Sequence, residues 1–201
     1  MRSAFFAQYL RRKCALFWAL SPLFLTIPAF SQTISAEALS TLQKGGHVLV
    51  MRHAQTVSGI GDPPNFKIGD CSTQRNLSDA GREAARALGV QLQKTNVKFD
   101  LVETSAWCRC VDTAKLAFAT RATIYAPLNS TFNDRSVQPN RTEEVQKRIR
   151  NWRGAGNLAL VSHNVNIQSL TGESLAMNEV IVLKPAPNEA AGFKIIGRLA
   201  Q

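Results

Sequence analysis

The sequence is poor in metal-binding residues, with three histidines and four cysteines among 201 residues. The histidines show no ligand spacing that would join them to the cysteines, and this disfavours a zinc site. The chain also lacks a glycine-rich phosphate loop, a paired-carboxylate metal motif and a serine nucleophile elbow. These absences predict a protein that works without a metal or another cofactor.

Internal repeats, low-complexity tracts and a clear interdomain linker are also missing from the sequence. The length is sufficient for one domain with a sizeable hydrophobic core. We therefore predict a single domain over residues 32–201, preceded by a segment that does not belong to the fold.

Residues 1–31 have the pattern of a secretory signal peptide, with four basic residues and no acidic one before an apolar stretch. Ala29 and Ser31 occupy the −3 and −1 positions, which predicts cleavage after Ser31. A retained membrane anchor is the alternative, but Pro22 and Pro28 interrupt the stretch and its length is marginal for a bilayer. We expect a periplasmic or secreted protein with no membrane span after cleavage.

Basic residues outnumber acidic ones, and the formal net charge of the chain is +10. Cleavage after Ser31 removes four basic residues and no acidic one, which lowers this charge to +6. The remainder has no lysine-arginine block interleaved with aromatics, so we expect no nucleic-acid partner. A moderate positive charge favours an acidic substrate such as a phosphate ester.

Three cysteines remain after cleavage, at positions 71, 108 and 110. Cys108 and Cys110 are too close in sequence for an ordinary bridge between them, and export permits a disulfide. Cys71 is therefore expected to pair with Cys108 or, as the alternative, with Cys110.

Short apolar runs predict six β-strands, the last two forming a hairpin at a sheet edge. The predicted strands cover residues 47–51, 99–105, 122–127, 157–163, 179–185 and 192–200. Helical patterns alternate with these strands and cover residues 79–95, 110–120 and 140–152. This alternation predicts an α/β fold: a three-layer sandwich with a mostly parallel central sheet flanked by helices.

Two details of the helix boundaries can also be predicted. Ser78 is expected to cap the first helix, and Asn140 and Glu143 have the spacing of a capping box at the start of the third. Residues 56–75 are rich in glycine, proline, asparagine and aspartate and predict a long loop. Long loops in compact domains are often functional.

Polar residues of similar chemistry lie at the ends of three of the predicted strands. Arg52 and His53 follow the first strand, Ser105 ends the second with Arg109 close behind, and Ser162 and His163 end the fourth. Ligands of open parallel sheets bind beyond the carboxyl ends of the strands, so we expect these side chains to converge there.

Two histidines and two arginines at one sheet edge are suited to phosphoryl transfer. A neutral imidazole is a nucleophile, and a guanidinium matches the oxygens of a phosphate. Arg52, Arg109 and a protonated His163 would hold the transferring group while His53 attacks it, without a metal.

Four ordered motifs resemble those of the histidine phosphatase superfamily, which has the phosphoglycerate mutase-like fold. They are "LVMRHAQT", "RNLSDAGREAARALG", "ETSAWCRCVDTA" and "ALVSHNVNI". The resemblance spans about Gly46 to Pro185. It implies that His53 takes the phosphoryl group, that Arg52 and Arg109 bind it, and that His163 contacts its oxygens.

Other roles implied by the resemblance concern the pocket and the general acid. Gln55 and Thr56 would line the pocket, and the backbone at Asn164 would donate a hydrogen bond. Many family members supply a carboxylic acid either directly after the second histidine or from a loop in mid-chain, whereas some small members lack it and act on good leaving groups. Asn164 excludes the first arrangement here, so we predict Asp134 as the acid, with Glu103 as the alternative.

The short exported form, with "DCSTQRNL" and "WCRC", is similar to small bacterial members akin to the lipopolysaccharide core heptose-phosphate phosphatase. This implies a small phosphorylated substrate, such as an envelope phosphosugar. The alternatives are a phosphohistidine-protein phosphatase, a mutase, and a non-catalytic phosphate- or glycan-binding envelope domain. The short chain disfavours a mutase, because mutases of this fold carry larger insertions. His47 is assigned no role, and Trp107 is expected to be a packing residue.

Overall fold

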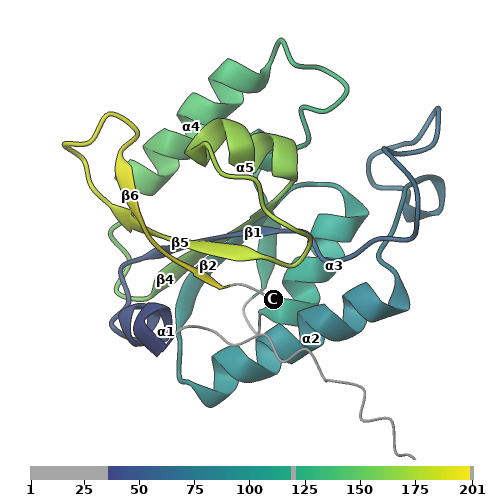
Figure 1. Cartoon of the computed structure of the whole chain (residues 1–201). Coiled ribbons are helices and arrows are strands. Elements are labelled where there is room, and N and C mark those ends of the chain that lie inside the picture. The colour runs from purple at the N-terminus through teal and green to yellow at the C-terminus, as the bar shows by residue number, and fades with distance from the viewer. Residues whose placement is uncertain (1–35, 119–120, 200–201) are drawn as a thin grey trace, which may run out of the picture.

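A computed structural model describes residues 36–118 and 121–199 and places six strands in one sheet, with helices on both faces (Figure 1). The strands are β1 (Val48–Arg52), β2 (Phe99–Thr104), β3 (Ala122–Ile124), β4 (Asn157–Ser162), β5 (Val180–Pro185) and β6 (Phe193–Leu199). The helices are α1 (Ala36–Gln43), α2 (Asp79–Lys94), α3 (Cys108–Ala117), α4 (Gln138–Arg150) and α5 (Asn164–Thr171). Two short 3₁₀ turns are η1 (Cys71–Thr73) and η2 (Ala126–Leu128).

The sheet is mostly parallel, in the order β3-β2-β4-β1-β5-β6. Strands β3, β2, β4 and β1 run parallel, whereas β5 is antiparallel to both β1 and β6. Every residue of β4 is buried, as expected for a central strand covered by helices on both faces. The predicted α/β sandwich with a C-terminal edge hairpin is therefore confirmed.

Two hydrophobic cores lie on opposite faces of the sheet. Strand β1 contributes to both because its side chains alternate, with Leu49 and Met51 in one core and Val48 and Val50 in the other. The first core packs against α1, α2 and α3, and the second against α4 and α5 (Figure 1). The layers hold the ends of the parallel strands in fixed relative positions.

Helix α2 begins as the sequence predicts. Ser78 Oγ accepts a hydrogen bond from the backbone N–H of Gly81, which confirms the N-cap. A side chain at Gly81 would overlap the carbonyl oxygen of Gln55. Glycine at this position therefore lets the start of α2 pack directly on the backbone that follows His53.

Several predicted boundaries differ from the structure. The predicted capping box at Asn140 is wrong: α4 begins at Gln138 with Val137 as its N-cap, and Glu143 forms an ion pair with Lys147 instead. Pro139 is tolerated in the first turn because the backbone N–H that proline lacks has no helical partner there. The helix predicted at 110–120 begins earlier and ends earlier, and α1 and α5 were not predicted.

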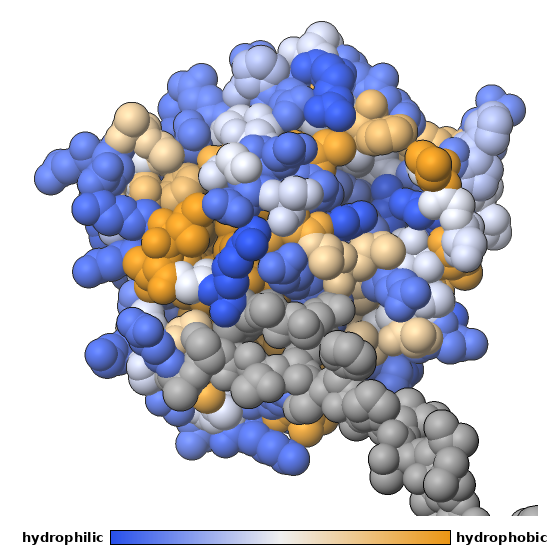
Figure 2. Space-filling model, in the orientation of Figure 1, coloured by the Kyte–Doolittle hydropathy of each residue, from blue (hydrophilic) through white to orange (hydrophobic). Residues whose placement is uncertain are grey.

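The face shown in Figure 2 is mostly hydrophilic, and hydrophobic residues gather on it over β5 and β6. Lys194 and Arg198 are exposed on the edge strand β6, where charged side chains discourage pairing with another chain. Among the described residues, no helix combines the length and apolar character that would let it cross a bilayer. The predicted signal peptide and its cleavage site lie outside the described residues.

Candidate active site

The site is built at the carboxyl ends of three neighbouring parallel strands. The His53 backbone N–H donates to Ser162 O over 3.0 Å, and the Ser105 N–H donates to Val161 O over 3.0 Å. These bonds continue the pairing of β1 and β2 with β4 and place His53, Ser105 and His163 at one edge. The His53 and His163 rings lie edge to face, with centroids 5.5 Å apart.

His53 is buried and held in one orientation. Its Nδ1 lies 2.9 Å from the carbonyl oxygen of Ala54. Because a carbonyl only accepts, Nδ1 carries the hydrogen and Nε2 keeps a free electron pair. Burial, and to a lesser degree repulsion by Arg109 and Arg52, lowers the pKa of His53 to about 3. The imidazole is therefore neutral at physiological pH, as a nucleophile must be.

Thr113 on α3 fixes the backbone beside this histidine. Its hydroxyl accepts from the Ala54 backbone N–H over 2.9 Å and donates to Arg109 O over 2.6 Å. The side chain is fully buried. Thr113 thus ties the residue after His53 to the helix that carries Arg109.

His163 is also buried and lies among polar groups. Its Nε2 is 2.9 Å from Ser105 Oγ, which lies 3.3 Å from Asn129 Oδ1, and its Nδ1 is 3.4 Å from Arg109 Nη2. Because the guanidinium only donates, Nδ1 is the acceptor and Nε2 carries the hydrogen. Burial, followed by repulsion from His53 and the arginines, lowers the pKa of His163 well below its usual value.

The two lowered pKa values predict that the protein loses stability in acid. Between about pH 6.5 and pH 3 the unfolded chain binds protons that the folded protein excludes, so stability falls as the pH falls. For His53 alone we expect a loss of about 2 kcal/mol from pH 7 to pH 5. Urea unfolding at both pH values measures it. His53→Gln should show the smaller loss, and the same loss in both proteins would contradict this origin.

Arg52 and Arg109 face the same cleft as the histidines. Arg52 Nη1 donates to Leu175 O over 2.7 Å, and Arg109 Nη1 forms a 2.7 Å ion pair with Asp62. In both arginines Nε is buried without a hydrogen-bond partner. Both arginines line the cleft, where their guanidinium groups make it suitable for an anion.

Asp62 was not predicted as a site residue. Its carboxylate accepts from Trp107 Nε1 over 3.0 Å and from the Arg75 backbone N–H over 3.0 Å, in addition to pairing with Arg109. The Asp62 and Arg109 side chains are each only 5% exposed. Asp62 therefore positions the Arg109 guanidinium. Trp107 packs as predicted but also lines the cleft, with its ring 5.4 Å from that of His163.

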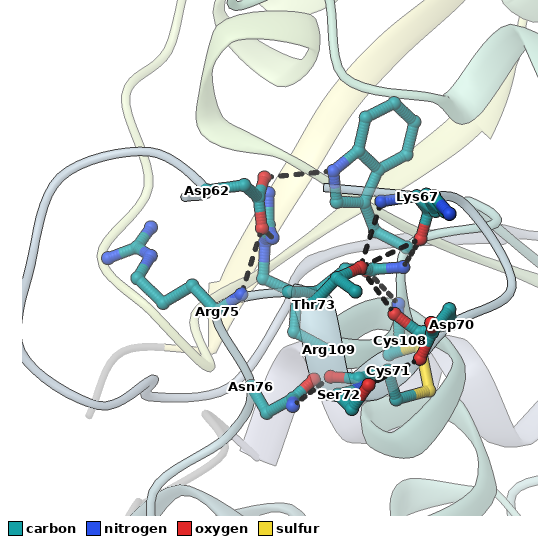
Figure 3. The surroundings of a disulfide bond; sticks show 12 residues. Asp62, Lys67, Asp70, Cys71, Ser72, Thr73, Arg75, Asn76, Cys108 and Arg109 are labelled. Carbon is teal, nitrogen blue, oxygen red and sulfur yellow. Dashed lines mark hydrogen bonds and ion pairs between the residues drawn. A yellow bond between two sulfur atoms is a disulfide. The ribbon is translucent and has the colours of Figure 1, made fainter. Parts of the chain in front are cut away.

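A disulfide between Cys71 and Cys108 fastens the loop that carries Asp62 to the start of α3 (Figure 3). The alternative pairing with Cys110 is wrong: this thiol is buried and free, and burial raises its pKa to about 12. The Cys108 backbone N–H also donates to Gln74 Oε1 over 2.9 Å. Loop and helix are thus joined directly before Arg109.

Removing this disulfide should destabilise the protein. The bridge closes a loop with a sequence separation of 37, for which chain entropy predicts a loss of about 4 kcal/mol. Chemical unfolding of the double variant Cys71→Ser/Cys108→Ser measures the loss. A reductant should lower the stability of the wild type to the same value and leave the double variant unchanged. Equal stability of oxidised wild type and double variant would contradict the prediction.

The cleft above the strand ends has a volume of about 570 Å³. Its walls come from the loop after β1 and from the loop before α4, which lie on the same side of the sheet in Figure 1. The residues that carry its charge are Arg52, Arg75, Arg109, Arg141, Asp62 and Asp134. Four guanidinium groups against two carboxylates make the cleft suitable for an anionic ligand.

Asn164 and Asp134 line the cleft among the remaining predicted residues. Asn164 begins α5, and its side chain is held by Ser174 Oγ and the Leu175 N–H, so a contact with an anion would come from the backbone at the helix start. Gln55 and Thr56 do not line the cleft. The Gln55 side chain is exposed, and Thr56 is buried with its Oγ1 3.8 Å from Met177 Sδ.

The two candidate acids lie in different surroundings. Asp134 is exposed, and hydrogen bonds from the Ser136 hydroxyl and N–H lower its pKa. Glu103 is buried and bound by Arg148 through two hydrogen bonds of 2.6 and 3.0 Å, so it does not reach the cleft. Within the described part of the chain, no three or more His, Cys, Asp or Glu residues are grouped so that they could hold a metal ion.

Comparison with known proteins agrees with this geometry. The sequence profile of the histidine phosphatase superfamily (branch 1) matches residues 48–138. A search of curated protein sequences found no significant match. The chain is similar in structure to the protein histidine phosphatase SixA complexed with tungstate, at 14% identity and a TM-score of 0.55, covering 77% of this chain and 96% of that one.

Two further structures share the fold. The alpha-ribazole phosphatase from Shigella flexneri has 17% identity and a TM-score of 0.55, with 77% of this chain and 96% of that chain covered. The mycobacterial glucosyl-3-phosphoglycerate phosphatase complexed with VO3 has 14% identity and a TM-score of 0.56, with 78% and 100% covered. At such identities these structures show the common fold and not a common substrate.

The profile match includes β1 with Arg52 and His53 and the start of α3 with Arg109. His163 follows the matched region, and the sheet brings it to the same edge. The superfamily profile thus matches the part of the chain that carries Arg52, His53 and Arg109, and the solved phosphatase structures share its fold.

Proposed function

We propose that the protein hydrolyses phosphate monoesters through a phosphohistidine formed on His53, without a metal ion. One observation carries this proposal: a neutral His53 with a free Nε2 lines the same cleft as Arg52 and Arg109. A phosphate dianion in this cleft would be bound by the arginines and attacked by the imidazole.

In the first step His53 Nε2 attacks phosphorus, the P–N bond forms and the P–O bond to the leaving group breaks. Arg52 and Arg109 stabilise the charge on the non-bridging oxygens. Burial and, after it, repulsion keep His163 neutral in the free protein; the bound dianion favours the charged form, so His163 takes up a proton from solvent and its Nδ1–H donates to the phosphoryl group. In the second step water attacks phosphorus, which breaks the P–N bond and releases orthophosphate and the neutral imidazole.

The general-acid role of Asp134 remains a proposal and predicts an effect that depends on the leaving group. Nitrophenolate departs without a proton, whereas an alkoxide needs one. Asp134→Asn should therefore retain hydrolysis of p-nitrophenyl phosphate within about threefold and lose about 10²-fold on glycerol 3-phosphate. Equal rates of wild type and variant on glycerol 3-phosphate would contradict this role. The hydrogen bonds that lower the pKa of Asp134 favour its ionised form, which cannot donate a proton. The test therefore decides whether Asp134 is the general acid.

We further propose that the enzyme acts after export, on a small phosphosugar of the bacterial envelope. The basic and apolar pattern of residues 1–31 supports export, and the Cys71–Cys108 disulfide is typical of an oxidising compartment. The cleft volume of about 570 Å³ is within the range of small-molecule pockets, and this favours a phosphosugar over a phosphohistidine protein.

The direct test measures orthophosphate released from p-nitrophenyl phosphate with an excess of chelator present. We expect hydrolysis at the rate observed without chelator. Absence of hydrolysis would favour a non-catalytic phosphate- or glycan-binding domain, and complete dependence on added metal would contradict the mechanism. A second assay compares a hexose phosphate with a phosphohistidine peptide, and preference for the peptide would overturn the proposed substrate class.

A further inference from the structure

A third arginine, Arg75, lines the cleft beside the predicted phosphate site. Its backbone N–H is bound by Asp62, and its Nη1 donates to Gly59 O over 2.6 Å, so the loop itself holds the side chain. Figure 3 shows the guanidinium of Arg75 turned away from the Asp62 carboxylate. The head group of Arg75 is thus positioned in the cleft by backbone contacts.

Asp62 attracts the charge of Arg75, but its carboxylate is already paired with Arg109. No ion pair joins Arg75 to an Asp or Glu in residues 36–118 and 121–199, where Asp62 pairs with Arg109 instead. Arg75 Nε is buried and has no hydrogen-bond partner. Burial, with added repulsion from Arg109, lowers the pKa of Arg75. A partly buried cation and an unpaired donor are both unfavourable unless a ligand supplies an anion.

The scissile phosphate does not require this third guanidinium. Its three non-bridging oxygens can accept hydrogen bonds from Arg52, Arg109, His163 and the start of α5. The repulsion that lowers the pKa of His53 and His163 is larger from Arg109 and Arg52 than from Arg75. Repulsion of Arg52, in contrast, is larger from Arg75 than from Arg109. The Arg75 backbone is bound to Asp62, which in turn holds Arg109, so Arg75 lies beside this pair in the wall of the cleft.

We propose that Arg75 forms a subsite for a second oxyanionic group, a phosphoryl group or a carboxylate, that the substrate carries near its scissile phosphate. The proposal rests on the proposed function, because it assigns the first anion to Arg52 and Arg109. A guanidinium binds either oxyanion through two parallel hydrogen bonds. The substrate class is accordingly a monoester with two anionic groups.

Non-hydrolysable probes test the subsite by calorimetry. Methylphosphonate presents one anion, phosphonoacetate adds a carboxylate, and methylenediphosphonate adds a second phosphonate. We expect wild type to bind at least one of the double anions about tenfold or more tightly than methylphosphonate. Arg75→Gln should remove most of this preference. Arg86→Gln, which removes the same charge from an exposed position on α2, should keep it.

Three outcomes would overturn the subsite: no preference in wild type, an unchanged preference in Arg75→Gln, or equal weakening of all three probes by this variant. Which double anion wild type prefers identifies the second group. Hydrolysis of p-nitrophenyl phosphate is measured on the same preparations. Failure of hydrolysis would refute the proposed function, while the ratio of binding constants still decides the role of Arg75.

Discussion

Alanine at position 53 should lower kcat for p-nitrophenyl phosphate by at least about 10³-fold, because His53 supplies the atom that takes the phosphoryl group. The hydrogen bond from Nδ1 to Ala54 O directs the free electron pair of Nε2 into the cleft, and no other group there can replace it. His163 carries its hydrogen on Nε2 and is turned toward Ser105 and Arg109. Its imidazole therefore cannot replace the lost nucleophile.

His47 provides the matched control for this substitution. It lies directly before β1, at the end of the strand opposite to His53, and does not line the cleft. His47→Ala should therefore keep kcat within about threefold of wild type, as is usual for residues that make no contact with the reacting groups. Comparable activity in His53→Ala and His47→Ala would rule out His53 as the nucleophile.

Lysine at position 109 should lower kcat/KM by about 10²-fold while the protein stays folded. The ammonium retains the charge that neutralises the buried Asp62, so no unpaired carboxylate is left in the interior. The ammonium lacks the several planar N–H donors of a guanidinium, however. It cannot bind both Asp62 and the oxygens of a phosphate. Steady-state kinetics and thermal unfolding of the same preparation separate loss of activity from loss of fold.

Arg148→Lys is the control for this prediction. Arg148 also binds a carboxylate that is nearly buried, that of Glu103, through two hydrogen bonds, but neither residue lines the cleft. Both variants thus replace an arginine that is paired with a carboxylate, and only one does so beside the proposed phosphate site. If the two variants had the same kcat/KM, Arg109 would have a structural role only.

The sequence is sufficient to bring Arg52, His53, Arg109 and His163 to one place. Each follows a short apolar run, and the alternation of strands and helices implies a parallel sheet whose strand ends share an edge. The register of β1 with β4, which pairs Arg52 with Ser162, has the arrangement that this argument requires. The Ser78 cap was equally predictable because it depends only on local spacing.

Asp62 and Arg75 could not be predicted from the sequence. Both lie in a loop, where no hydrophobic period relates position to direction, and Asp62 contacts Arg109 across 47 residues. For the same reason, the sequence could not decide whether Cys108 or Cys110 pairs with Cys71. On α3 the two cysteines point in different directions, and only the fold shows that Cys110 faces His163, with Sγ 3.5 Å from its Nε2. Which side chains form the wall of the cleft therefore depends on the tertiary structure.

The most direct test of the phosphohistidine mechanism is to trap the intermediate. The enzyme is mixed with p-nitrophenyl phosphate, quenched in alkali, in which phosphohistidine survives, and digested for mass spectrometry. We predict one added phosphoryl group on the peptide that contains His53, lost again on treatment with acid and absent from His53→Ala. Continued release of orthophosphate with no phosphoryl group on His53, or with one on His163 instead, would contradict the mechanism.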